Sequence, residues 1–130
     1  MGVIDPAEIR RSVQRAQRLL DRFRRHPLWQ EIDAASQRWH EVPVDYLSAS
    51  GATSGRIDIL YRSDSGAWKL VDFKTDRLRT MDDLDTGKRD GYVRQVRNYL
   101  SAAAVLLEPA PQASLCFLNV DGSIVIEPVI

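Results

Sequence analysis

The chain has 130 residues, of which 44% are apolar and 28% charged, and its formal net charge is zero. This length supports one domain that buries roughly two-thirds of its unfolded surface, and the composition is ordinary for a globular protein. No apolar run approaches the length of a membrane span, no signal-peptide pattern opens the chain, and no Cys/His spacing resembles a zinc site. The single cysteine, Cys116, excludes an internal disulfide, and its place in "SLCFL" predicts a buried thiol in a cytoplasmic protein.

Residues 5–25 predict an amphipathic helix with an apolar and a basic face. Asp5 is a candidate N-cap, and Pro6 follows at the first helical position. Both faces repeat at helical spacing; the apolar one holds Ile9, Val13, Ala16, Leu20 and Phe23, and the basic one Arg11, Arg15, Arg18, Arg22 and Arg25. A solvated helix surface is the more common explanation of such an arginine face. A ridge that follows the phosphates of a nucleic acid is the alternative.

The remaining elements complete an α/β pattern. His26-Pro27 ends the first helix, and the spacing of Leu28, Ile32, Ala35 and Trp39 predicts a short second one. Further elements are predicted at 41–49 (strand), 54–62 (strand), 67–75 (strand), 76–91 (mobile loop), 92–107 (helix) and 113–129 (two strands around an Asp-Gly turn). The three tryptophans are expected in the core; they are Trp29, Trp39 and Trp68. The order ααβββαββ predicts one α/β domain over 1–130, with a mixed central sheet flanked by helices.

Two aspartates and a lysine stand out in "GRIDILYRSDSGAWKLVDFKTD". A three-residue turn at 64–66 ending in glycine fixes the register of the two strands. That register places Asp58 directly opposite Asp72, with Cβ atoms roughly 5 Å apart. Lys74 follows two positions later and therefore points to the same face as Asp72.

Carboxylates paired in this way repel each other, and burial increases the cost. A divalent cation between them reverses the sign of the interaction, and ligands that are all oxygen select Mg²⁺ or Mn²⁺ over zinc. The metal would act as a Lewis acid and as a template for the substrate. The ammonium group of Lys74 would orient an attacking water and stabilise charge developing on a phosphoryl group. The hairpin therefore predicts the cleavage of phosphodiesters.

These residues carry a resemblance to a known family. "GRID", "DFKT" and "YVRQVRNY" resemble, in order, the Gly-x-Ile-Asp, Asp-Tyr/Phe-Lys-Thr and Tyr-x-x-Gln-x-x-x-Tyr elements of the PD-(D/E)XK nuclease superfamily. The closest type is the RecB/AddA-type nuclease domain of UvrD-like helicase–nucleases. "EVPV" resembles the strand that precedes these elements in the family. The resemblance implies a restriction-endonuclease-like core and a metal-dependent exonuclease of DNA repair and recombination, acting on single-stranded ends delivered by a helicase in cis or in trans.

The resemblance also implies roles for individual residues. Asp58 and Asp72 would bind Mg²⁺ or Mn²⁺, with the Phe73 carbonyl as a candidate third ligand. Lys74 would be the catalytic lysine, and Glu41 an accessory acid near the metal.

Further along, Gln95 and Tyr99 lie one helical turn apart and would face the site, where they would contact the nucleic acid or steady the lysine. Tyr92, which begins the same motif, is expected to pack in the core.

One part of the family pattern has no counterpart here. Family members usually carry, before these elements, a helix with a Gly-Thr-x-x-His pattern whose histidine helps to bind metal. Neither His26 nor His40 lies in such a pattern, and both are expected to be ordinary surface or core residues. The chain is therefore expected to be a fragment or a minimal version of a larger helicase–nuclease. A catalytically inactive nucleic-acid-binding or structural module with the same fold is the alternative function.

Overall fold

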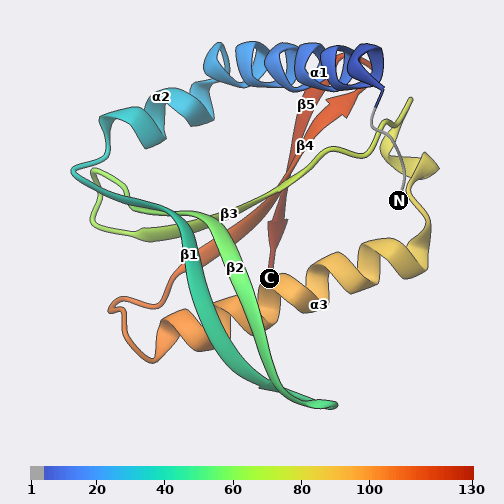
Figure 1. Cartoon of the computed structure of the whole chain (residues 1–130). Coiled ribbons are helices and arrows are strands. Elements are labelled where there is room, and N and C mark those ends of the chain that lie inside the picture. The colour runs from blue at the N-terminus through green and yellow to red at the C-terminus, as the bar shows by residue number, and fades with distance from the viewer. Residues whose placement is uncertain (1–4) are drawn as a thin grey trace.

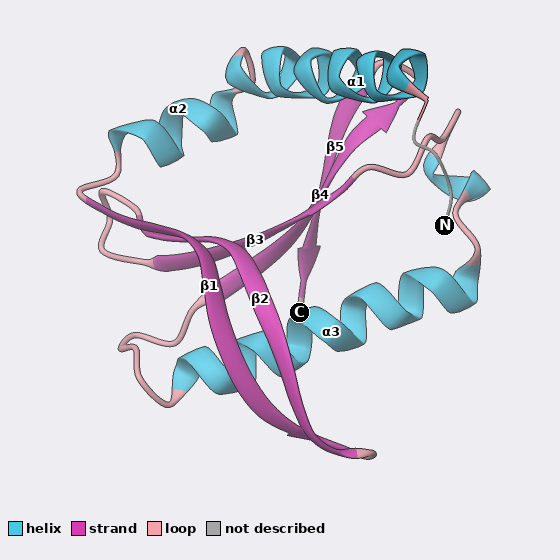
Figure 2. Cartoon of the chain, viewed as in Figure 1, coloured by secondary structure: helices cyan, strands magenta, loops and turns pink. Residues whose placement is uncertain are grey.

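The computed structural model describes residues 5–130 as one sheet with helices on both of its faces (Figures 1 and 2). The elements are, in order, α1 (Pro6–Arg24), α2 (Pro27–Ala34), β1 (Gln37–Ser48), β2 (Gly51–Arg62), β3 (Trp68–Lys74), a 3-10 turn η1 (Met81–Asp83), α3 (Thr86–Ala104), β4 (Gln112–Val120) and β5 (Ser123–Val129). The predicted order ααβββαββ and the α/β class are confirmed. None of the described helices is long and apolar enough to cross a membrane.

The sheet is mixed, as predicted. Its five strands lie in the order β1-β2-β3-β4-β5, and only β3 and β4 are parallel. Helix α3 makes the crossover between these two strands, as a parallel pair requires. Helices α1 and α2 cover one face and α3 covers the other (Figure 1).

Each face of the sheet has its own hydrophobic cluster. On the α3 side the buried residues include Ile57, Leu60, Leu70, Val96, Tyr99 and Phe117. On the α1 side they include Phe23, Ile32, Ile59, Tyr61, Val71 and Cys116. Cys116 is fully buried, and this burial raises the pKa of its thiol to about 12. The prediction that Cys116 is a buried core residue is confirmed, and a raised thiol pKa lowers its reactivity.

The register of the β2–β3 hairpin agrees with the prediction. The Ser63 N–H donates to the Ala67 carbonyl at 2.9 Å, and Gly66 takes the left-handed conformation with φ +86°. Residue pairs then run from Arg62 opposite Trp68 to Ile59 opposite Val71. The pairing ends there, so Asp58 and Asp72 lie one step beyond the last pair of the ladder.

Helix α1 also begins as predicted. The side chain of Asp5 accepts a hydrogen bond from the Ala7 N–H at 3.0 Å. The apolar stripe, however, is buried at its end only: Phe23 is 5% exposed, whereas Ile9, Val13 and Leu20 are 46–53% exposed. Most of α1 therefore lies over the sheet without packing tightly on it.

The prediction for Trp39 was wrong. The second helix ends at Ala34, because Ala35 turns to extended dihedrals, and Trp39 belongs to strand β1. There it pairs with Leu60 and stacks on Trp68 with ring centroids 5.6 Å apart, while 47% of it stays exposed. The spacing from Ile32 to Trp39 was a coincidence of sequence and does not reflect a continuous helix face.

The loop predicted at 76–91 is shorter than expected. Helix α3 begins at Thr86, six residues before the prediction, because Asp85 caps it by accepting from the Lys88 N–H at 3.0 Å. Before it, Leu78 and Leu84 are buried, and Leu78 forms an isolated parallel bridge with Val120. Because this segment is rich in charges, the sequence analysis did not predict that Leu78 and Leu84 are core residues or that Asp85 caps a helix.

Candidate active site

Asp58 lies where strand β2 separates from its neighbour β3. The regular pairing of these strands stops at Ile59, and the Phe73 N–H donates to Asp58 Oδ2 at 2.8 Å. The Asp58 carboxylate thus accepts the hydrogen bond that a backbone carbonyl of β2 would accept in a regular β2–β3 pair. This hydrogen bond fixes the carboxyl group beside Asp72.

The alternation of faces also changes at Asp58. Ile57 and Leu60 both pack on the α3 side, whereas Ile59 packs on the α1 side. Across the strand pair, His40 opposes Ile59 and Val42 opposes Ile57, and Glu41 between them has a positive φ of 53°. A left-handed non-glycine residue is uncommon within a strand. This irregularity lets Asp58 turn out of the regular pleat.

Asp72 is the most deeply buried member of the site. Its side chain is 7% exposed, and the Lys74 Nζ atom, itself on a side chain that is 14% exposed, lies 2.8 Å from Asp72 Oδ2. Among residues 5–130 no hydrogen bond reaches Asp72 Oδ2, so the Lys74 ammonium is what compensates the charge of this buried oxygen.

The electrostatics of Asp58 follow from this neighbourhood. Burial raises the pKa of the Asp58 carboxyl, and the charge of Asp72 raises it further, although the Phe73 hydrogen bond and the Lys74 ammonium act in the opposite direction. Because Asp58 lies close to Asp72, the ionised form of Asp58 is less stable than that of an isolated aspartate.

Helix α3 supports the lysine. Gln95 Oε1 accepts a hydrogen bond from Lys74 Nζ at 3.3 Å. The Tyr92 ring lies under the same ammonium group, 4.1 Å from Nζ to the ring centroid, which is cation–π geometry. Tyr92 is itself held, because its hydroxyl donates to the Asp76 carboxylate at 3.0 Å. Lys74 is therefore fixed by two side chains of α3 as well as by Asp72.

Tyr99 holds strand β2. It is 3% exposed, and its hydroxyl accepts from the Arg56 N–H at 3.3 Å. Its ring lies against Gly55 so closely that a Cβ there would be 2.6 Å from Tyr99 Cε1. The glycine of "GRID" and the last tyrosine of "YVRQVRNY" thus touch each other. The burial of Tyr99 leaves it no surface for the nucleic-acid contact that we expected.

Glu41 lies across from Asp58 in the β1–β2 pair, and both residues line the same cavity. The Glu41 side chain is 74% exposed, and its carboxylate pairs with Arg56 Nη1 at 3.7 Å. Within the described part of the chain, no three His, Cys, Asp or Glu side chains converge as a metal-binding group. His26 caps α2 by accepting from the Leu28 N–H, and His40 is exposed. The structure brings together Asp58, Asp72 and Lys74, and it places Glu41 beside the same cavity as Asp58, with its carboxylate paired to Arg56.

Two carboxylates fit a magnesium-type ion. Mg²⁺ usually binds through one or two carboxylates and keeps waters or substrate phosphate oxygens as its other ligands. Asp58 and Asp72 would supply the carboxylates, with the Phe73 carbonyl as a further oxygen. The closeness of the two carboxyl groups is the observation that favours this fit, because a cation would offset the repulsion between their charges. Such an ion would supply Lewis-acid chemistry at a phosphoryl oxygen.

Tyr92 packs against the core as predicted, but sequence reasoning missed its contact with Lys74 and the role of Asp76, which was assigned to a mobile loop. Burial acts to raise the pKa of the Asp76 carboxyl, but hydrogen bonds from Lys88 and Tyr92 hold it below its ordinary value. Asp76 comes two residues after Lys74, at the end of β3, and this closeness was the one available signal.

On the α1 side, Asp58 opens onto a cavity of about 670 Å³ between α1 and the sheet. The cavity is also lined by His40, Glu41 and Phe73. Asp58 therefore faces accessible space, whereas Asp72 and Lys74 lie against α3.

Comparisons with known proteins agree with this arrangement. The sequence matches the family model of the PD-(D/E)XK nuclease superfamily over residues 4–128. A solved structure titled "Crystal structure of SSO0001" is similar in fold, with a TM-score of 0.55 and 16% sequence identity. The match covers 95% of this chain and 52% of that one, so the chain spans about half the length of the solved protein. A search of curated proteins found no match.

Proposed function

The chain belongs to the PD-(D/E)XK nuclease superfamily, and from this membership we propose that its Asp58–Asp72–Lys74 site hydrolyses DNA phosphodiester bonds with the help of Mg²⁺ or Mn²⁺. The observation that carries the proposal is the convergence of two carboxyl groups, Asp58 and Asp72, beside an ammonium group that Gln95 and Tyr92 hold in place.

The residues of the chain divide the work between them. Asp58 and Asp72 would hold the cation, which would polarise the phosphoryl group. Lys74 would orient the attacking water and stabilise the negative charge that develops on phosphorus-bound oxygens. Gln95 and Tyr92 position Lys74, because they contact its ammonium and nothing of the carboxylate pair. A lysine held in this way loses little side-chain freedom when substrate binds.

The finer parts of the proposal are supported by the order of sequence motifs. The RecB/AddA-type pattern favours an exonuclease that receives single-stranded ends from a helicase, in the same polypeptide or as a separate protein, in DNA repair. In that arrangement Glu41 would act as an accessory acid once substrate or a further segment of the full-length protein approaches. In the same proposal, residues 1–130 form a single nuclease domain that works as part of a larger helicase–nuclease.

The test is cleavage of end-labelled single-stranded DNA in Mg²⁺, in Mn²⁺ and in EDTA. We expect cleavage by the wild type with either metal and none in EDTA. Lys74→Ala and Asp72→Ala should each lower the rate at least about 100-fold, since each removes a group that acts at the reacting phosphate. Lys69→Ala is the matched control, because Lys69 is on the same strand and pairs with Glu31 away from the site. Equal rates in wild type and Lys74→Ala would refute the proposal.

The second candidate function is an inactive nucleic-acid-binding module. It is favoured by one observation, that the described residues offer no third His, Cys, Asp or Glu ligand next to Asp58 and Asp72. Metal-independent binding of DNA without cleavage under any of the three conditions would support it.

A further inference from the structure

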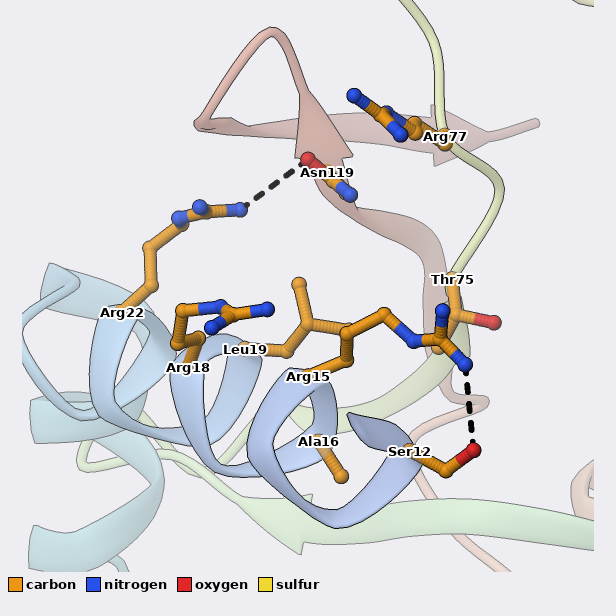
Figure 3. A pocket seen from close by; sticks show the side chains of 9 residues that line it. All are labelled: Ser12, Arg15, Ala16, Arg18, Leu19, Arg22, Thr75, Arg77 and Asn119. Atoms are coloured by element: carbon orange, nitrogen blue, oxygen red, sulfur yellow. Dashed lines mark hydrogen bonds between the residues drawn. The ribbon is translucent and has the colours of Figure 1, made fainter. Parts of the chain in front are cut away.

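Arginines from two distant parts of the sequence line one cavity beside the candidate active site. The cavity measures about 650 Å³ and lies between α1, the residues that follow β3, and the end of β4. Arg15, Arg18 and Arg22 come from α1, and Arg77 comes from the segment after β3. Figure 3 shows the three α1 guanidinium groups on the side of the helix that faces Asn119 and Thr75. We call this space the arginine cavity.

The arginine cavity holds no negative charge of its own. No aspartate or glutamate lines it, and within residues 5–130 none of its four arginines forms an ion pair with a carboxylate. Elsewhere in the chain, arginines do find carboxylates, as Arg38 does with Asp33 and Arg89 with Glu127. Like charges that converge without a counterion repel each other, and a bound anion removes this repulsion.

The four arginines differ in how far they are already engaged. Arg22 Nη1 donates to the Leu118 carbonyl at 2.6 Å and so ties α1 to the end of β4. Arg15 donates only to Ser12 on its own helix, at 3.2 Å. For Arg18 and Arg77 the structure shows neither a hydrogen bond nor an ion pair among the described residues. Three of the four guanidinium groups are thus free to take phosphate oxygens in the bidentate geometry that arginine favours.

The arginine cavity adjoins the cavity at Asp58. Ala16, Leu19 and Thr75 line both the arginine cavity and the neighbouring cavity onto which Asp58 opens. Thr75 is also the residue after Lys74. A chain of phosphates lying on the arginines would therefore pass Thr75 and approach Asp58.

From these observations we propose that the arginine cavity binds the phosphodiester backbone of a single strand and leads it to the Asp58–Asp72–Lys74 site. The proposal rests on the nuclease function proposed above and adds the residues that grip the substrate. A volume of about 650 Å³ falls within the roughly 300–1,000 Å³ of pockets for compact ligands. It admits a short stretch of sugar–phosphate chain and is too small for a duplex. The phosphate-following ridge, which the sequence offered as the less common explanation of the arginine face, is the one that this geometry favours.

The experiment measures binding apart from cleavage. Fluorescein-labelled oligothymidylate is titrated with the protein in EDTA over a series of salt concentrations, and binding is followed by fluorescence anisotropy. The double variant Arg15→Gln/Arg18→Gln is compared with Arg11→Gln/Arg24→Gln, which makes the same change of charge on the same helix at positions that do not line the cavity. Arg77→Gln tests the side of the cavity formed by the segment after β3. Circular dichroism checks that each variant is folded.

We expect the cavity double variant to bind about tenfold more weakly. The slope of its log affinity against log salt concentration should fall by about 0.7 for each phosphate that is no longer neutralised. Arg77→Gln should bind about threefold more weakly, and the control double variant should change less than twofold. Equal effects in the two double variants would overturn the proposal, because they would show that only the overall charge of α1 matters. Unchanged binding by both Arg15→Gln/Arg18→Gln and Arg77→Gln would overturn it as well.

Two further measurements identify the kind of nucleic acid that binds. They also distinguish a failure of the arginine-cavity proposal from a failure of the nuclease proposal. Oligouridylate tested in parallel shows whether DNA or RNA is preferred, and a blunt duplex should bind more weakly than the single strand. Tighter binding of the duplex would contradict the proposal. Because all binding is measured without metal, a wild type that binds through the arginines but never cleaves would refute the nuclease function alone. A wild type that cleaves, with arginine variants that bind normally, would refute only the arginine cavity.

Discussion

The two faces of the sheet hold their functional residues in opposite ways. On the α3 face, Lys74 touches Asp72, Gln95 and Tyr92, and its side chain is 14% exposed. On the α1 face, Asp58 opens onto a cavity, and most of the apolar stripe of α1 is about half exposed. The difference indicates that Lys74, which would have to be placed accurately for catalysis, is fixed by its neighbours. The α1 face, which would receive a nucleic acid chain, stays open.

The largest loss of stability should come from removing the Lys74 ammonium group on the α3 face. Lys74→Met keeps the length of the side chain but leaves the Asp72 carboxylate buried beside Asp58 without its cation. We expect a loss of about 3 kcal/mol in the free energy of unfolding in EDTA, as for other broken buried pairs. Added Mn²⁺ should restore a large part of it, because an ion that binds only the folded state stabilises that state.

The matched control for this prediction is Lys69→Met on the same strand. Lys69 pairs with Glu31 at 3.0 Å, but both side chains are about one-third exposed. The expected loss is at most about 1 kcal/mol, with no recovery on adding Mn²⁺. Urea unfolding with and without metal measures both variants, and equal losses would show that the Lys74 environment is not special.

A second test concerns the contact between Gly55 and Tyr99. Gly55→Ala would place a methyl group 2.6 Å from Tyr99 Cε1, so the buried ring has to move, at a cost of about 2 kcal/mol. Gly91→Ala on α3 is the control, since nothing lies within 4 Å of a Cβ there. It should instead stabilise the protein by about 0.5–1 kcal/mol through helix propensity. Thermal unfolding of the two variants should therefore shift in opposite directions.

The same substitution on the two long helices compares the faces directly. Val96 on α3 is fully buried, and Val13 on α1 is 50% exposed. Val96→Ala should cost about 1.5 kcal/mol, because two methyl groups leave the core and alanine recovers only part of this through its higher helix propensity. Val13→Ala should change the free energy of unfolding by less than about 0.5 kcal/mol. Similar losses at both positions would show that α1 is packed as tightly as α3.

The smallest predicted effect is the pH dependence of Asp58. Its folded pKa is raised, so its favourable contribution is complete at pH values below the ordinary range of an aspartate and is lost as the pH rises through the folded pKa. Asp58→Asn cannot ionise, yet it keeps an oxygen for the Phe73 N–H. In EDTA at pH 7 the variant should be more stable than wild type by up to about 1 kcal/mol.

This gain should disappear below pH of about 4, where the wild-type carboxyl is also protonated. Asp90→Asn, at an exposed position of α3, controls for the loss of one negative charge and should show no such trend. A wild type that gains stability relative to Asp58→Asn as the pH rises from 4 to 7 would contradict the sign of this prediction.

Much of the fold could be predicted from local patterns. The glycine turn set the hairpin register, and Asp5 and Pro6 marked the start of α1, because such signals act within a few residues. What the sequence could not show depended on packing between distant segments. Examples are the exposure of Val13 on α1, the seating of Tyr99 on Gly55 and the buried place of Leu78 in a highly charged segment.

The site was predictable to a similar degree. The hairpin register that brings Asp58 near Asp72 and Lys74 can be counted in the sequence, but it does not reveal that the pairing ends at Ile59 or that Asp58 opens onto the α1 side. The position of Glu41 could not be counted, since a left-handed residue in β1 changes the alternation of faces there. The arginine cavity depends on where α1 lies over the sheet, and no spacing in the sequence contains that information.

The most direct test of the metal site is a calorimetric titration of Mn²⁺ into the wild type, Asp72→Asn and Lys74→Met. If Asp58 and Asp72 are the metal ligands and Lys74 acts in the chemistry, Asp72→Asn should lose more than about tenfold in affinity. Lys74→Met should then bind Mn²⁺ at least as tightly as the wild type, because a competing cation has been removed. Equal affinities in the wild type and Asp72→Asn, or no saturable binding in any of the three, would contradict the metal site on which the proposed nuclease function depends.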